Sequence, residues 1–224
     1  MNAAVPAAEL AAILETALAP CPHFADVCAG YARWEPARGY VPRGYLGATG
    51  RAGEVRLVLA SAEPSEPDEG DAYEGTPRRM LEAAAAHSLA AFEKGPRRHS
   101  APAPFHRNLR KILDFCWPGE PLEEQLGKTW IAPAVLCSAP IFGMPIPRAM
   151  ETTCIHEYIR REIETLGDVF IVALGAKAHA RLERGGITAA FVAQHPSARP
   201  ITKPEASWSA CGTAFRSWLA AQTA

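Results

Sequence analysis

The chain has 224 residues, of which 48% are hydrophobic and 21% charged, with a formal net charge of −1. This composition is typical of a folded globular protein, and it excludes overall charge as the means of binding a polyanion. No run approaches the roughly 20 apolar residues that a membrane helix needs, and the N-terminal alanines lack the basic lead of an export signal. We therefore expect a soluble, cytoplasmic, monomeric protein with a single domain over residues 1–224.

The first 50 residues predict a helix and a long loop. Over residues 6–19, four apolar side chains recur at helical spacing, namely Leu10, Ile13, Leu14 and Leu18. The loop that follows is rich in glycine, proline and aromatic residues, and loops of this length are usually functional or held in place by other contacts. We expect the helix and loop of residues 1–50 to pack on the rest of the domain.

A short apolar run, Val55 to Leu59, predicts the first strand. Its residues are apolar apart from Arg56, which is typical of a strand buried on both faces of a parallel sheet. Three small residues follow, and then Glu63 and Pro64. A proline disfavours the helical conformation of the residue before it, so Glu63 is expected in an extended exit from the strand. Open α/β sheets bind their ligands at this carboxyl end of the strands.

A helix beginning at Pro77 is expected to run to about Phe92, and a basic segment follows it. Between Gly95 and Leu113 there is no acidic residue, whereas five residues are basic: Arg97, Arg98, Arg107, Arg110 and Lys111. Such a segment is either a solvated helix face with a linker or a surface that contacts phosphates.

The second half of the chain alternates strands with helices. One helix is marked by apolar residues at helical spacing, namely Ile155, Ile159, Ile163 and Leu166. Strands are expected over residues 129–136, 169–174 and 187–192, and helices over residues 175–182 and about 206–221. With the first strand, this alternation predicts an α/β fold, a three-layer αβα sandwich with a central four-stranded, mostly parallel sheet.

Two strand ends carry unusual sequence, Glu63-Pro64-Ser65 after the first strand and His195-Pro196-Ser197 after the last. Either motif alone is more typical of a structural group. In this order, with Val-Phe-Ile-Val-Ala-Leu-Gly at residues 169–175 between them, they resemble the uracil-DNA glycosylase superfamily. The resemblance covers about residues 28–217, and residues 137–182 are most similar to the iron–sulfur branches of that family.

The resemblance implies a role for each matched residue. Glu63 falls at the position of the water-activating acid of the commonest branch, whereas the iron–sulfur branches have their acid one place earlier, where this chain has Ala62. His195 matches the histidine that hydrogen-bonds the departing base. Three further residues match the serines that pinch the DNA backbone and the wedge that fills the gap left by the flipped nucleotide: Ser65, Ser197 and Arg199.

The implied activity is that of a monofunctional DNA glycosylase, which flips a damaged or modified base out of DNA, hydrolyses its N-glycosidic bond and leaves an abasic site. Cleavage leaves positive charge on the sugar and negative charge on the base, which a carboxylate and an imidazole donor respectively stabilise. Extruding the base costs a few kcal/mol. The basic residues Arg107, Arg110 and Lys111 would hold the DNA backbone meanwhile.

Two departures from the family favour a target other than uracil. Uracil-specific members end the second strand with an asparagine that reads the base, and alignment through Cys137 puts Pro133 there. Ser65 is small where the family usually has a residue that blocks larger bases. A base pocket lined by Ala62, Pro64 and Pro133 would suit a modified pyrimidine. The specific hypothesis is a substituted cytosine of phage DNA, and hence antiviral defence; DNA repair would use the same residues.

Four of the six cysteines partly match the ligands of a [4Fe–4S] cluster. Cys137 and Cys154 lie where the iron–sulfur branches place their last two ligands, but Cys21 and Cys28 are separated by six residues instead of two. The resemblance implies a cluster that fixes the N-terminal loop to the sheet. Buried, inert thiols are the alternative. The sequence contains no nucleotide-binding motif, so no nucleotide cofactor is expected.

Two other functions fit parts of the sequence. A DNA-binding protein that kept this fold without the chemistry would account for Ala62 and Pro133, although the carboxylate of Glu63 argues against it. A hydrolase using Cys137 and His195, which both follow strands, lacks an orienting acid and a nucleophile elbow. DNA is thus the expected partner, and no membrane is.

Overall fold

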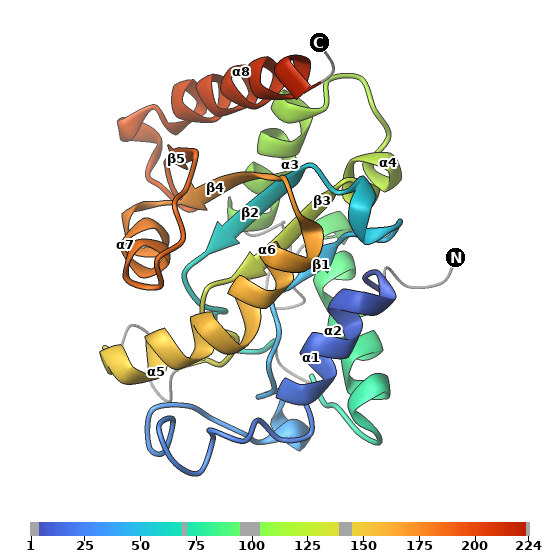
Figure 1. Cartoon of the computed structure of the whole chain (residues 1–224), viewed down its shortest axis with the longest axis vertical. Coiled ribbons are helices and arrows are strands. Elements are labelled where there is room, and N and C mark those ends of the chain that lie inside the picture. The colour runs from blue at the N-terminus through green and yellow to red at the C-terminus, as the bar shows by residue number, and fades with distance from the viewer. Residues whose placement is uncertain (1–4, 69–70, 95–103, 139–144, 223–224) are drawn as a thin grey trace.

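The computed structural model describes residues 5–68, 71–94, 104–138 and 145–222 (Figure 1). Within these residues a five-stranded sheet runs through the middle in the order β1-β3-β2-β4-β5. Neighbouring strands are parallel except β1, which is antiparallel to β3. The strands are β1 Leu46–Gly47, β2 Leu57–Ser61, β3 Thr129–Pro133, β4 Phe170–Leu174 and β5 Phe191–Ala193.

The predicted parallel sheet is confirmed, with one strand more than expected. The extra strand, β1, lies in the long N-terminal loop and is only two residues long, so it leaves no periodic pattern in the sequence. Strand β3 ends at Pro133, earlier than residue 136. Strand β5 begins at Phe191, later than Ile187, because the Ile187 amide closes the turn after the preceding helix by donating to the Leu182 carbonyl at 2.9 Å.

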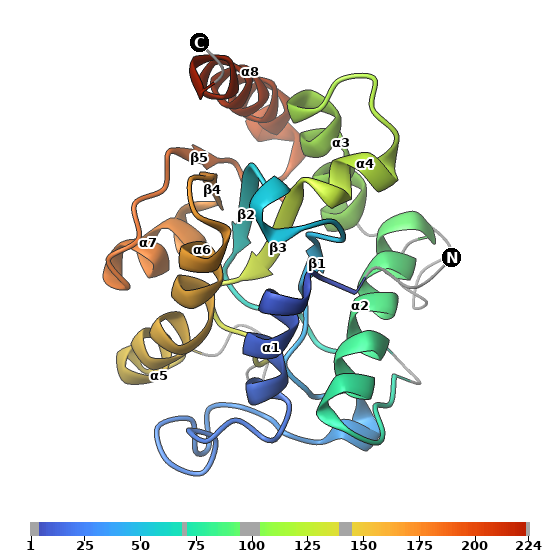
Figure 2. The same ribbon diagram turned by 45° about the vertical axis from the view of Figure 1, so that its right-hand side comes forward.

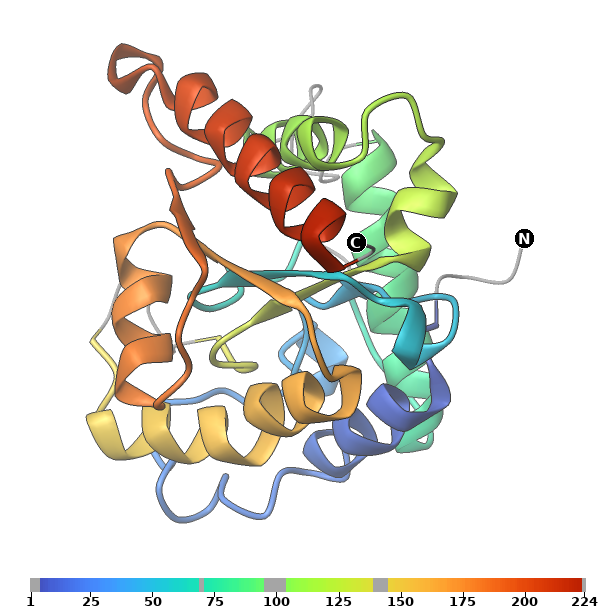
Figure 3. The same ribbon diagram turned by 45° about the horizontal axis from the view of Figure 1, so that its top comes forward.

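Helices cover both faces of this sheet, which gives the three layers visible in Figure 3. Helices α1, α5 and α6 cover one face, and α3 and α8 pack together on the other. Helix α2 packs beside α1 (Figure 2). The helices are α1 Ala8–Ala17, α2 Pro77–Lys94, α3 Pro104–Cys116, α4 Leu122–Gly127, α5 Arg148–Cys154, α6 Arg160–Leu166, α7 Ala176–Arg184 and α8 Pro204–Gln222. A π-helical stretch, Ile155–Ile159, joins α5 to α6.

Strand β2 separates two hydrophobic cores. Val58 and Ala60 pack in the core below α1 and α6, whereas Leu57 and Leu59 pack in the core below α3 and α8. All four side chains are fully buried. Successive residues of a strand point to opposite faces, so a strand between two helical layers must be apolar at every position. This explains the continuous apolar run in the sequence.

The direction in which strands are added to the sheet reverses between β2 and β4. From β2 the chain moves to β3 on one side, and then returns past β2 to β4 and β5 on the other. Such a reversal leaves a gap between the connections of the two central strands, where doubly wound sheets bind ligands. The segments that leave β2, β4 and β5 therefore meet at one edge of the sheet.

The N-terminal segment packs along the sheet. The Ala7 amide donates to the Ala48 carbonyl at 2.8 Å, and the Arg43 amide donates to the Leu136 carbonyl at 3.1 Å. These bonds join the segment to β1 and to the chain just beyond β3. Among the described residues, no helix combines the length and the apolar character needed to cross a membrane.

Candidate active site

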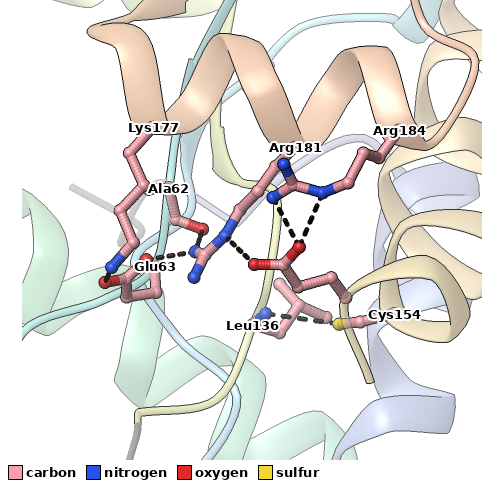
Figure 4. Close-up of polar contacts among 8 residues, drawn as sticks. Ala62, Glu63, Leu136, Cys154, Lys177, Arg181 and Arg184 are labelled. Carbon is pink, nitrogen blue, oxygen red and sulfur yellow. Dashed lines mark hydrogen bonds and ion pairs between the residues drawn. The ribbon is translucent and has the colours of Figure 1, made fainter. Parts of the chain in front are cut away.

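Glu63 lies just beyond β2 and contacts two cations of α7. The Lys177 ammonium donates to Oε1 of Glu63, and the Arg181 guanidinium donates to Oε2 (Figure 4). Residues four apart on a helix lie on the same side of it, so both cations face the carboxylate. The Glu63 side chain is 24% exposed. A carboxylate is thus held in a fixed position at the sheet edge, with access from solvent.

Arg181 is the buried centre of a charge network. Its side chain is 1% exposed, and it donates to the Ala62 carbonyl at 2.6 Å and to Oε1 of Glu151 at 2.8 Å as well as to Glu63. Arg184 donates to the other oxygen of Glu151 at 2.9 Å. A buried charge is tolerated only when it is paired and hydrogen-bonded, as this one is. Helices α5 and α7 thereby fix the position of Glu63.

Sequence reasoning missed Lys177 and Arg181, although Arg181 leaves a signal. It follows the buried Ala178 by three residues and precedes the buried Leu182, so it stands on the apolar face of a short helix. A charged residue at a core-facing position is unusual enough to indicate a buried ionic partner.

His195 follows β5 and presents a neutral imidazole to the same edge. The Ser197 amide donates to Nδ1 of His195 at 3.0 Å, so the proton of the neutral ring is on Nε2. Partial burial lowers the pKa of His195, and the negative charge of Glu63 partly offsets that effect. The start of α7 lies against both residues predicted to be catalytic, because Gly175 approaches His195 and Lys177 contacts Glu63.

Gly175 allows the chain after β4 to pass close to His195. Its φ is +95°, and a Cβ atom built there would lie 3.0 Å from Cβ of His195. Helix α3 lies on another side of the histidine: the Phe105 ring is 5.7 Å from the imidazole, and Asn108 donates to the Pro196 carbonyl at 2.7 Å. The His-Pro-Ser loop is thus held between the start of α7 and the start of α3.

Two of the three residues expected in the base pocket lie together. A Cβ atom built at Gly44 would lie 3.4 Å from Pro64 and 3.6 Å from Pro133, so both prolines pack on that glycine. Ala62 packs into the hydrophobic core and contributes its carbonyl to Arg181. Ser138 donates to the Ser65 carbonyl at 2.9 Å, which fixes the chain beyond Pro64.

The residues expected to bind DNA differ in whether they form ion pairs within the chain. Ser65, Ser197, Arg199 and Arg107 are exposed. Two of the basic residues of α3 have acidic partners within the chain: Arg110 contacts Asp114 at 3.2 Å and Lys111 contacts Glu205 at 3.3 Å. This pairing favours a solvated helix face for that part of α3. Arg97 and Arg98 lie outside the described residues.

The four cysteines expected to bind a cluster line one cavity. Cys21 and Cys28 come from the N-terminal loop, Cys137 follows β3, and Cys154 ends α5. Burial, with smaller contributions from neighbouring cysteines, raises the pKa of Cys28 to about 11 and that of Cys154 to about 12.

Two of these sulfur atoms already accept hydrogen bonds. Tyr158 Oη donates to Cys21 Sγ at 3.1 Å, and the Leu136 amide donates to Cys154 Sγ at 3.4 Å. Donors to sulfur are the contacts that stabilise thiolates bound to iron. Among the residues the structure describes, no three His, Cys, Asp or Glu side chains converge on a single metal ion. Four thiols that border one cavity are the kind and number of ligands that a four-iron cluster takes.

The other two cysteines lie apart from this cavity. Cys116 and Cys211 are buried in the core between α3 and α8, where a hydrogen bond with Cys211 and burial raise the pKa of Cys116. They are packing residues.

No model of a known protein family matches the chain, and no curated protein matches it in sequence. The resemblance to the uracil-DNA glycosylase superfamily is therefore a prediction from the sequence motifs alone.

Proposed function

We propose that the protein is a DNA glycosylase that extrudes a modified base and hydrolyses its N-glycosidic bond. One observation carries the proposal: Glu63 and His195, from the ends of β2 and β5, both lie against the turn between β4 and α7, where Gly175 approaches His195 and Lys177 contacts Glu63. A carboxylate beside a neutral imidazole supplies the two groups that N-glycosidic cleavage requires.

In the proposed reaction each group acts on one side of the bond that breaks. His195 donates its Nε2 proton in a hydrogen bond to the base oxygen, where negative charge develops. Glu63 stabilises the positive charge on the sugar and orients the attacking water. Assistance of this kind contributes roughly 10²–10⁴-fold to the rate. Arg181 positions Glu63 through the contacts described above.

The pocket residues support a modified pyrimidine as the target. Pro133 offers no side-chain hydrogen bond with which to read the edge of uracil, and the small Ser65 leaves room beside Pro64. A substituted cytosine in phage DNA suits a pocket of this kind, and antiviral defence is the function that such a substrate implies.

A [4Fe–4S] cluster forms part of the proposal. Cys21, Cys28, Cys137 and Cys154 would hold it, and the donors on Tyr158 and Leu136 support two of these ligands. The cluster would supply covalent links between the N-terminal loop and the sheet.

One observation favours a second candidate, a DNA-binding protein without excision activity. Both oxygens of Glu63 accept hydrogen bonds, from Lys177 and from Arg181. Two cations on one carboxylate offset the negative charge that would stabilise the sugar cation, so excision is favoured when one of them moves away. The exposed Lys177 is the partner that can leave.

Base release from a panel of DNAs tests the proposal. The panel carries uracil, hypoxanthine or phage-type modified cytosines, and the proteins compared are wild type, Glu63→Gln and His195→Ala. The matched control is Glu183→Gln, an exposed glutamate of α7 that pairs with His179. We expect release of a modified cytosine by wild type and the control, and a loss of two or more orders of magnitude in the two site variants.

The outcomes separate the candidates. Release of uracil alone would contradict the proposed target. No release from any substrate, with DNA binding intact, would establish the binding protein in place of the enzyme.

A further inference from the structure

The geometry points to a second reaction at this site, and we propose that Lys177 gives the protein an abasic-site lyase activity. In this reaction the Lys177 amine forms a Schiff base with the aldehyde of the abasic sugar, and the DNA strand is cleaved by β-elimination. The inference rests on the proposed function in one respect, since the abasic sugar is the product of base excision. It goes beyond that function because hydrolysis alone leaves the strand intact.

Lys177 is close to where the sugar must lie. Its ammonium donates directly to Oε1 of Glu63. If Glu63 orients a water against C1′ of the sugar, three contacts of about 3 Å each join the lysine nitrogen to that carbon, through Oε1 and the water. A lysine has four rotatable bonds in its side chain, so its amine can cover this distance without movement of the backbone.

Lys177 is also the cation that the site can release. Arg181 is 1% exposed and holds Glu63 together with the Ala62 carbonyl and Glu151, whereas the Lys177 side chain is 53% exposed. The buried arginine therefore keeps the carboxylate in place when the lysine leaves it. A second cation on a carboxylate that is already positioned needs another explanation, and a nucleophilic amine provides one.

Two other lysines form ion pairs with glutamates outside the candidate site. Lys111 pairs with Glu205 at 3.3 Å, and Lys128 pairs with Glu120. The pairing of a lysine with the candidate catalytic carboxylate is thus particular to Lys177 among the ion pairs described.

The chemistry balances with the groups present. The Lys177 ammonium passes a proton to Glu63, and the free amine adds to the aldehyde carbon to form a carbinolamine. Glu63 returns the proton to the hydroxyl, which leaves as water, and an iminium ion remains. The Glu63 carboxylate then removes a proton from C2′, the C3′–O bond breaks, and the 3′ phosphate leaves. Water hydrolyses the imine, which releases the unsaturated aldehyde and restores the amine.

Borohydride trapping tests the inference on DNA whose abasic site is made beforehand from uracil by a separate uracil-excising enzyme, which is removed before the assay. Borohydride reduces the imine to a stable amine, so protein and DNA become covalently linked. The proteins are wild type, Lys177→Arg and Lys203→Arg. Arginine keeps the positive charge next to Glu63 but forms no Schiff base here. Lys203 is an exposed lysine in the segment that follows the His-Pro-Ser motif, and it controls for chance reaction with nearby amines.

We expect a trapped complex and strand cleavage on the 3′ side with wild type, a decrease of at least tenfold with Lys177→Arg, and less than a twofold change with Lys203→Arg. Peptide mapping should place the reduced adduct on Lys177. Absence of a trapped complex with wild type, or an equal yield with Lys177→Arg, would overturn the inference. Because the abasic site is supplied, trapping is independent of base release. A protein that releases bases without trapping would retain the proposed function and lose only this inference.

Discussion

A single hydrogen bond determines which nitrogen of His195 carries the proton. Nδ1 accepts from the Ser197 amide, so a second proton can bind the ring only at Nδ1 and must break that bond. Partial burial lowers the pKa of His195 below its usual value of 6.5. The neutral donor is therefore the form present at neutral pH.

The first prediction is a pH profile. Protonation at Nδ1 breaks the bond from the Ser197 amide that positions the ring, and the pKa of the ring is lowered. Single-turnover base release should therefore not fall through protonation of His195 until the pH is below 6.5. His195→Ala should be slower by about 10²-fold or more and should lack this acidic limb. Identical profiles for the two proteins would contradict the assigned role of the imidazole.

Arg181 leads to a prediction about stability. Replacing it by methionine leaves Glu151, which is 8% exposed, without its buried partner, so we expect a loss of about 3–5 kcal/mol in the free energy of unfolding. Lys177→Met is the matched control, since it removes a cation from the same site at an exposed position and should cost no more than about 1 kcal/mol. Urea denaturation compares them. Equal losses would mean that the buried network does not hold the site.

Glu162 is a buried carboxyl whose charge opposes folding. Burial raises its pKa to about 7, although the hydrogen bond from Trp130 lowers it. The unfolded chain ionises this group first, so its contribution destabilises the fold progressively as pH rises from about 4.5 to about 7 and then stays constant. Glu162→Gln should therefore equal wild type in stability at pH 4 and exceed it by up to about 3 kcal/mol at pH 8.

Thermal or urea unfolding across this pH range measures the effect of Glu162→Gln. The exposed neighbour Glu164, changed to glutamine, is the control and should leave the pH dependence unaltered. The prediction would be contradicted if wild type, Glu162→Gln and Glu164→Gln showed the same change in stability between pH 4.5 and pH 7.

At the scale of elements, the turn between β4 and α7 fixes the distance between the two motifs. Gly175 combines a positive φ with a close approach to His195, and its amide donates to the Ala193 carbonyl of β5 at 2.8 Å. Gly175→Ala should both strain the backbone and displace the histidine. We expect base release to fall by at least tenfold with a loss of about 1–3 kcal/mol in stability. Gly53→Ala, where an added Cβ meets nothing within 4 Å, is the control.

The sequence predicts most elements because most are marked by periodicity. Helix α1 and strands β2 and β4 differ from the predicted bounds by a few residues only. Elements without such a mark were missed: β1 is two residues long, and α4 has six residues. The strand ends that carry Glu63 and His195 were predictable because proline and small residues follow short apolar runs. The contact of Glu63 with Lys177 and Arg181 was not, because over a hundred residues separate the partners in sequence.

For the whole molecule, the cysteine cavity joins the N-terminal loop to the sheet and to α5. Protein produced with iron and purified without oxygen should contain iron and inorganic sulfide in equal amounts. Cys28→Ser should lose them, and the loop should become more sensitive to proteases. Cys116→Ser, which lies in the core between α3 and α8, should keep the iron. A protein that contains no iron when purified in this way would exclude the cluster and leave four buried thiols.

One turn of α5 carries both Glu151 and Cys154. Glu151 holds Arg181, which holds Glu63, while Cys154 borders the cysteine cavity three residues further on. A cluster bound at Cys154 would therefore hold the same helical turn that anchors the carboxylate. In the proposed glycosylase, loss of the cluster would stop base excision without any change to Glu63 or His195.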